Sequence, residues 1–127
     1  MIKGIGTDIV RIDRIERALA RHPKAFTERV LHPNELLIFA NHNQPCAYLA
    51  KRFAAKEALS KALGTGIAKG VSFDEIEVKN DAMGRPLLEL HHHTKAIAES
   101  MGVVSSFLTL ADEKNYAIAY VVLEGEE

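Results

Sequence analysis

The spacing of hydrophobic and polar residues divides the chain into a helical first half and a second half of short strands. Between residues 46 and 63, Leu49, Phe53 and Glu57 recur at four-residue spacing, which predicts one long helix. Gly64 and Gly66 follow, and glycine is the usual signal for the end of a helix. Shorter helices are predicted before the long one, with Asp13 as the cap of the first, at about 14–21, 25–30 and 34–42.

The remaining segments alternate apolar and polar residues and predict strands. They are separated by turns, and a short helix is predicted at 94–101. The predicted strands lie at 2–12, 72–79, 87–90, 103–110 and 116–123. Because strands joined by short turns run antiparallel and the helices are grouped mostly in the first half, the fold class is α+β. Gly4 and Gly6 in the first strand mark a place where another part of the chain comes close.

The bulk composition is that of a small globular protein. A chain of 127 residues with 47% hydrophobic residues has the size of one domain, here residues 1–127. No apolar run has the length of a membrane span, so no membrane partner is expected. Cys46 is the only cysteine and has no partner for an internal disulfide, which favours a reducing compartment; we expect the cytoplasm.

The charge of the chain is unevenly distributed. The net charge is only −1, which argues against general nucleic-acid binding. Two windows are nevertheless basic: residues 11–29 carry six basic and three acidic side chains, and residues 51–69 carry five basic side chains and Glu57. Two basic windows on an otherwise acidic chain predict anionic partners at specific places.

Two carboxylates stand in unusual settings and are the first candidates for chemistry. Asp8 lies within an apolar strand, where an ionised acid needs a partner such as a metal ion or an arginine. Glu57 shares a helix stripe with Ser60 and Lys61, ahead of the glycine-rich helix end. Mg²⁺ takes one or two protein carboxylates together with phosphate oxygens, and a lysine neutralises phosphate charge. The structural alternatives are an aspartate at the rim of the sheet or a salt bridge for Asp8, and an i,i+4 helix pair between Glu57 and Lys61.

Other polar groups are weaker candidates. Basic residues follow one face of the first helix and continue beyond it, which suits an acidic protein or a polyphosphate, although a solvated helix face explains them equally well. These residues are Arg14, Arg17, Arg21 and Lys24. His91, His92 and His93 are adjacent, so they cannot converge as helical i,i+4 ligands do, and a solvent-exposed junction is expected. The Gly64–Gly66 segment lacks the lysine spacing of a nucleotide P-loop.

Four segments resemble one known family along essentially the whole chain. Residues 4–12, GIGTDIVRI, are similar to the first motif of the small holo-[acyl-carrier-protein] synthases of the 4'-phosphopantetheinyl transferase superfamily. Residues 52–62, RFAAKEALSKA, are similar to the second motif of that family. Residues 80–86 resemble its hairpin, and residues 108–117 resemble its C-terminal strand pair. One departure is that Ala111 and Asp112 stand where some members have a histidine.

The resemblance implies a fold and an activity. The fold is the α+β 4'-phosphopantetheinyl transferase fold, an antiparallel sheet packed against a long helix and shorter helices. The activity is Mg²⁺-dependent transfer of 4'-phosphopantetheine from coenzyme A to a serine of apo-acyl carrier protein, which supports fatty acid biosynthesis. The other product is adenosine 3',5'-bisphosphate. No nucleophile is required of this chain, because the serine belongs to the carrier protein.

The resemblance also implies roles for individual residues. Asp8, Glu57 and Lys61 are the catalytic candidates; Asp8 and Glu57 bind Mg²⁺, and Lys61 contacts the pyrophosphate. Residues assigned to coenzyme A binding are Arg52, Ser60, Lys61, Gly64, Gly84, Arg85 and Pro86. The hairpin residues among them act from a neighbouring chain of a homotrimer, and the stripe from Arg14 to Lys24 receives the acidic carrier protein.

Three points stay open at the level of the sequence. The general base could be Glu57, Asp8 or a metal-bound hydroxide. A module that binds coenzyme A without turnover would use the same basic windows, and a purely structural trimerisation domain would need only the helix pair.

Overall fold

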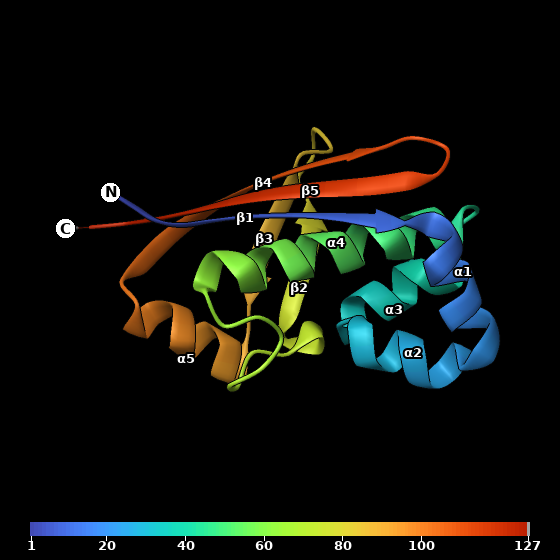
Figure 1. Cartoon of the computed structure of the whole chain (residues 1–127), viewed down its shortest axis with the longest axis horizontal. Helices are drawn as coiled ribbons and strands as arrows, with labels where there is room; N and C mark the ends of the chain where they lie inside the picture. The colour runs from blue at the N-terminus through green and yellow to red at the C-terminus, as the bar shows by residue number, and fades with distance from the viewer. Residues whose placement is uncertain (127) are drawn as a thin grey trace.

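The computed structural model describes residues 1–126, in which most helices are grouped in the first half and most strands in the second, as in an α+β chain (Figure 1). The elements in order are β1 (Ile2–Arg11), α1 (Ile12–Arg21), α2 (Pro23–Val30), α3 (Pro33–Ala40), α4 (Pro45–Leu63), η1 (Phe73–Glu75), β2 (Ile76–Asn80), β3 (Pro86–Leu90), α5 (His92–Ser100), β4 (Val103–Asp112) and β5 (Tyr116–Gly125). The predicted fold class is confirmed, as is the long helix that ends at Gly64, whose φ of 78° is the left-handed conformation of a helix C-cap. None of the helices in residues 1–126 is long and apolar enough to cross a membrane.

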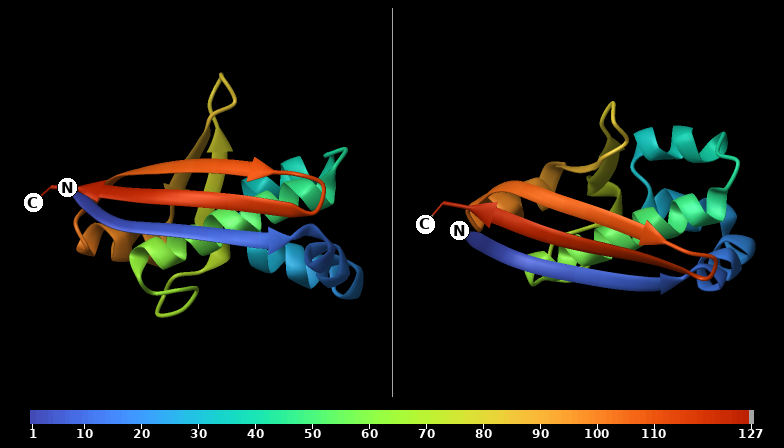
Figure 2. Two further views of the ribbon diagram at one scale, coloured as in Figure 1. Left: turned by 45° about the horizontal axis from the view of Figure 1, so that its top comes forward. Right: turned by 90° about the horizontal axis from the view of Figure 1, so that it is seen from above.

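The largest sheet holds the three long strands in the order β1-β5-β4, with antiparallel neighbours. The helices lie on one side of this sheet, and α4 runs along that face (Figures 1 and 2). Alternate residues of β5 point inward and are completely buried: Ala117, Ala119, Val121 and Leu123. Buried alanines of α4 meet them, and their small side chains let the helix lie close to the strands.

The two predicted close-approach glycines bring β1 onto α4. A Cβ atom on Gly4 would lie 1.9 Å from the carbonyl oxygen of Ala62, and one on Gly6 would lie 1.9 Å from that of Ala58. Only hydrogen atoms fit there, so the strand rests directly on the helix backbone. This contact fixes which residues of β1 and α4 face each other, including Asp8 and Lys61.

A second sheet is the hairpin of β2 and β3, whose tip stands clear of the helices (Figure 2). The tip is shaped by Asp81, because its Oδ1 accepts hydrogen bonds of 2.9 Å from the backbone N–H groups of both Met83 and Arg85. Gly84 supplies the positive φ of 86° that the turn needs. The strand predicted at 72–79 begins only at Ile76, after the single 3₁₀ turn of η1.

The predicted helix cap at Asp13 is wrong. Strand β1 continues directly into α1, which begins at Ile12, and the capping position belongs to Arg11, without a side-chain cap. The carboxylate of Asp13 is instead paired with the guanidinium groups of Arg11, at 2.7 Å, and Arg17, at 3.5 Å. The Asp13 carboxylate, which would have accepted the capping hydrogen bond, is thus bound by two nearby arginines.

Candidate active site

Asp8 and Lys61 meet where β1 crosses α4. The ammonium group of Lys61 donates to Oδ1 of Asp8 at 3.1 Å and to the carbonyl oxygen of Thr7, also at 3.1 Å. The side chain of Asp8 is only 15% exposed, while that of Lys61 is 52% exposed. The partner that an acid in an apolar strand needs is therefore a lysine from 53 residues away, and the helix pair between Glu57 and Lys61 is not among the ion pairs of residues 1–126.

Glu57 lies one helical turn before Lys61, and the pKa of its carboxyl group is affected by the negative charge of Asp8. Burial raises the pKa of the Glu57 carboxyl, the negative charge of Asp8 raises it further, and the positive charges of Lys61 and Arg29 offset only part of the rise. Two carboxylates, one of which raises the pKa of the other, are a donor set suited to a divalent cation, which would stabilise both charges at once. The residues present therefore fit Mg²⁺.

Arg29 is a basic residue near this site to which the sequence assigned no role of its own. It lies in α2, its guanidinium stands over the ring of Phe73 at 5.7 Å, and its charge acts on Glu57. Residues of α1 and α2 line a groove that includes Arg29, together with Ala18, Arg21, His22, Ala25 and Phe26. The basic window at 11–29 was the only signal in the sequence that pointed to Arg29.

Ser60 and Gly64, both predicted to bind coenzyme A, are engaged in the end of α4. The hydroxyl of Ser60 is buried and donates to the carbonyl oxygen of Glu57 at 2.7 Å. The carbonyl oxygen of Ser60 in turn accepts hydrogen bonds from the backbone N–H groups of Thr65 and Gly66. These groups hold the helix end in place beside Lys61, and their contact with a phosphate stays a prediction.

Arg52 points toward the hairpin and away from the two carboxylates. It precedes Lys61 by nine residues, a rise of about 13 Å along α4. Its guanidinium is 4.3 Å from the centre of the Tyr48 ring and donates to Oδ1 of Asn80 at 2.8 Å. The arginine is 6% exposed, and its Nε atom and the hydroxyl of Tyr48 are buried with no hydrogen-bond partner among residues 1–126.

The hairpin residues Gly84, Arg85 and Pro86 do not join the carboxylate site of their own chain. Among residues 1–126, no hydrogen bond or ion pair links them to Asp8, Glu57 or Lys61. Their position at an exposed tip leaves them free to reach another molecule.

The basic stripe of the first helix is exposed, as its prediction requires. Arg14, Arg17 and Arg21 lie on α1, where Arg17 is paired with Asp13. Lys24, at the start of α2, is 4.0 Å from Glu28. Within residues 1–126, Arg14 and Arg21 take part in no ion pair, so their charges are available to an acidic partner.

A buried ion pair beside the site was not foreseen from the sequence. The ammonium of Lys56, with no exposed surface, donates to Oε1 of Glu35 at 2.5 Å and to the carbonyl oxygen of Val30 at 2.6 Å. Glu35 also accepts hydrogen bonds from the backbone N–H groups of His32 and Val78. One carboxylate thus joins α3, α4 and β2 behind the helix face that carries Glu57.

Comparison with known proteins shows the family to which this chain belongs. The family model of the 4'-phosphopantetheinyl transferase superfamily matches residues 4–121. The chain is 56% identical over 123 residues to a holo-[acyl-carrier-protein] synthase of Photobacterium profundum, which covers 97% of this chain and 98% of the relative. The chain therefore belongs to the 4'-phosphopantetheinyl transferase superfamily, among the holo-[acyl-carrier-protein] synthases.

Solved structures of the same family share the fold. The crystal structure of the enzyme from Neisseria meningitidis is 45% identical, with a TM-score of 0.93 over 98% of this chain and 99% of that one. The enzyme from Bacillus anthracis, in complex with CoA (3',5'-ADP), is 41% identical, with a TM-score of 0.83 over 99% of both chains. The predicted 4'-phosphopantetheinyl transferase fold is thereby confirmed.

Proposed function

We propose that this chain is one domain that transfers 4'-phosphopantetheine from coenzyme A to a serine hydroxyl of apo-acyl carrier protein, with Mg²⁺ bound, in support of fatty acid biosynthesis. The observation that carries the proposal is the meeting of Asp8, Glu57 and Lys61 where β1 crosses α4. Kinship over nearly the whole chain with holo-[acyl-carrier-protein] synthases, one of them in complex with CoA, supports coenzyme A as the donor.

In this proposal each of the three residues has a distinct task. Asp8 and Glu57 would hold Mg²⁺, which when bound supplies positive charge to the pyrophosphate oxygens of coenzyme A. Lys61, half exposed and already directed at Asp8, contributes a second positive charge to the same pyrophosphate. Transfer of a phosphoryl-type group depends mainly on positioning and charge neutralisation, which this chain's residues provide without a nucleophile of their own.

We further propose a homotrimer with active sites between subunits, working in the cytoplasm. The support lies on the outer face of the β1-β5-β4 sheet, which no helix of residues 1–126 covers (Figure 2). Outward-facing apolar side chains form cross-strand rows there: Ile5–Val122–Phe107 and Ile9–Ile118–Ala111. Ile9 is 59% exposed and Phe107 52% exposed, and an apolar face of this kind is typical of an interaction surface.

Replacing Ile118 with lysine is therefore expected to dissociate the assembly. Burying an ammonium in the centre of an apolar interface is unfavourable, so the mass by light scattering falls from that of three chains to that of one. Leu37→Lys is the matched control, because Leu37 is an exposed apolar residue on α3. A trimer that persists in Ile118→Lys, or an equal loss in Leu37→Lys, would contradict the assignment of this face.

The basic stripe is proposed to receive the acidic carrier protein. Reversing Arg14, Arg17 and Arg21 to glutamate is expected to raise the apparent KM for the carrier protein about tenfold or more, which corresponds to about 1.4 kcal/mol. The KM for coenzyme A should stay the same. The difference between the variant and the parent protein in the KM for the carrier protein should become smaller as salt is added. Lys95→Glu, an exposed charge reversal on α5, is the control. An unchanged KM for the carrier protein would place docking elsewhere.

The proposed function is tested by the intact mass of an apo-acyl carrier protein after incubation with this chain, coenzyme A and Mg²⁺. A gain of one phosphopantetheinyl group, prevented by EDTA, is expected. Tight binding of coenzyme A without any gain would indicate a module that binds without turnover. Absence of both coenzyme A binding and turnover would indicate a purely structural domain.

A further inference from the structure

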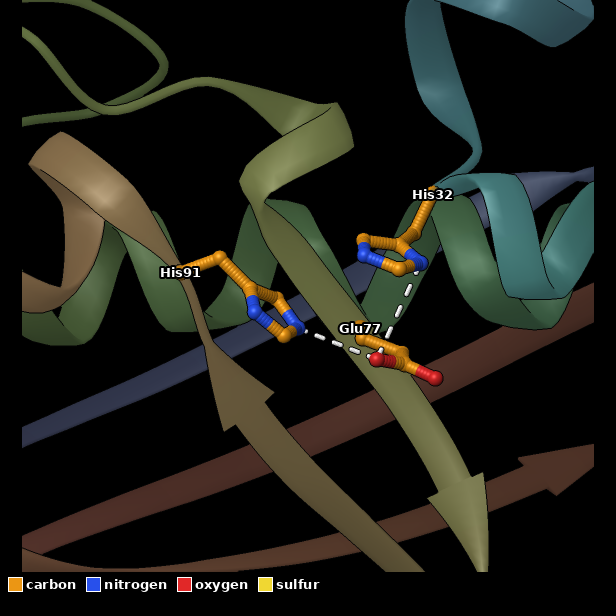
Figure 3. Close-up of side chains that lie close together, drawn as sticks. All are labelled: His32, Glu77 and His91. Carbon is orange, nitrogen blue, oxygen red and sulfur yellow. Dashed lines mark hydrogen bonds and ion pairs between the residues drawn. The ribbon is translucent and has the colours of Figure 1, made fainter.

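Three side chains from separate elements converge on the side of the molecule that carries the β2–β3 hairpin (Figure 3). His32 precedes α3, Glu77 lies in β2, and His91 follows β3. Oε1 of Glu77 is 3.0 Å from Nε2 of His91 and 3.7 Å from Nδ1 of His32. The two imidazole rings stack with their centres 4.6 Å apart. Each ring directs one nitrogen at the same carboxylate oxygen (Figure 3).

The electrostatics of this cluster favour a positive ion. Burial by itself raises the pKa of the Glu77 carboxyl, but hydrogen bonds from Asn34 and His91, with the nearby charges of His32 and Lys79, leave it lower than usual. Glu77 is 4% exposed, so it is a carboxylate held ionised in a nearly dry place. A second carboxylate, Glu89, lies 3.3 Å from Nε2 of His91 and is paired with Lys79 at 3.2 Å. Both histidines are neutral when they bind a metal ion, and Glu77, Glu89 and Lys79 then leave one negative charge uncompensated.

We infer that His32, Glu77 and His91 form a binding site for a transition-metal dication such as Zn²⁺, separate from the carboxylate pair of Asp8 and Glu57. Two imidazole nitrogens and one carboxylate oxygen are a donor set that suits Zn²⁺, Co²⁺ or Ni²⁺, whereas Mg²⁺ prefers oxygen donors. Glu89 or a water molecule completes the coordination. The ion binds where β2, the end of β3 and the start of α3 meet, and so joins them.

Binding requires two local changes. Nε2 of His91 gives up its proton, which either moves to Nδ1 of the same ring or leaves to solvent. Nδ1 of His32 accepts a hydrogen bond of 3.1 Å from the backbone N–H of Asn34 as the cap of α3. Since the ring nitrogen has one lone pair, an ion bound at Nδ1 replaces this hydrogen bond. The amide of Asn34 therefore reports on occupation of the site.

The test uses the full chain without a polyhistidine tag, titrated with ZnCl₂ by calorimetry and by amide NMR. We expect about one equivalent of Zn²⁺ to bind and the Asn34 amide signal to shift. His91→Ala is expected to weaken binding by more than about 100-fold, because loss of outer-shell partners alone costs metal sites about 10- to 100-fold. His92→Ala is the matched control, since it removes an exposed neighbouring histidine and leaves the site intact.

The outcomes separate a built site from adventitious binding. Binding of equal strength in His91→Ala and His92→Ala would overturn the inference, as would no binding of Zn²⁺ or a titration in which the Asn34 amide does not move. Glu77→Gln is a second variant that keeps the size of the side chain and removes its charge, and its thermal unfolding without metal shows whether the fold survives. In that variant Zn²⁺ no longer raises the unfolding temperature, whereas it does so in the parent chain.

Discussion

Asp8→Asn and Glu57→Gln are each expected to lower the rate of phosphopantetheine transfer about 1000-fold or more while the protein stays folded. A metal ion contributes several kcal/mol to stabilising charge in a transition state, and each 1.36 kcal/mol corresponds to a factor of ten in rate. Removing one of two proposed carboxylate ligands withdraws most of that contribution. The measurement is the single-turnover rate with carrier protein in excess, together with the Mg²⁺ concentration at half-maximal rate, which should rise.

Stability distinguishes this effect from simple loss of an ion pair. The partner of Asp8, Lys61, is half exposed, and an ion pair screened by solvent contributes at most about 1 kcal/mol to the free energy of unfolding. Asp8→Asn should therefore unfold at nearly the same denaturant concentration as the parent. Asp74→Asn, which changes an exposed aspartate in η1, is the control and should retain full activity. Normal transfer rates in Asp8→Asn would contradict the proposed metal site.

The sequence singled out the two carboxylates as candidates but did not predict how they are arranged. Asp8 stood out because an acid is unusual in an apolar strand, and Gly4 and Gly6 correctly indicated a close approach. The identity of the approaching element could not be predicted, because strand periodicity carries no information on contacts across the chain. Helix spacing therefore offered only Glu57 as a structural partner for Lys61, whereas the structure pairs Lys61 with Asp8.

The three consecutive histidines show the same limit. The expectation of exposure holds for His92 and His93 and is wrong for His91, which is half buried against Glu77. The junction of β3 and α5 turns successive side chains in different directions, so adjacent residues experience different surroundings. His32 and Glu77 come from other elements, and a local pattern could not have brought the three together.

Lys56→Met is expected to lower the free energy of unfolding by about 3–5 kcal/mol, because it leaves the carboxylate of Glu35 buried and without its charged partner. Both side chains are essentially inaccessible to solvent, so water cannot replace the lost hydrogen bond. Burial lowers the pKa of the Lys56 ammonium, and the charge of Glu35 opposes that change. The charged form of Lys56 is therefore stabilised by Glu35. The measurement is the denaturant midpoint with an unchanged slope.

The double variant decides whether the cost arises from the unpaired charge. Glu35→Gln removes that charge, so Lys56→Met combined with Glu35→Gln should be less destabilised than the sum of the two single variants. Lys95→Met, an exposed lysine on α5, should change the free energy of unfolding by less than about 0.5 kcal/mol. If Lys56→Met unfolds like Lys95→Met, the buried pair does not stabilise the fold.

The same pair also bears on how α4 presents the face that carries the proposed metal ligand Glu57. Lys56 precedes Glu57 by one residue, which places the two side chains about 100° apart around the helix. Lys56 holds one side of α4 to Glu35 and to the end of α2, and Glu57 lies near enough to Asp8 for that charge to raise its pKa. At a low temperature where Lys56→Met is folded, the rate of transfer should therefore be lower because more Mg²⁺ is needed to reach the half-maximal rate. Loss of activity only in proportion to the unfolded fraction would show that the pair stabilises the fold without positioning Glu57.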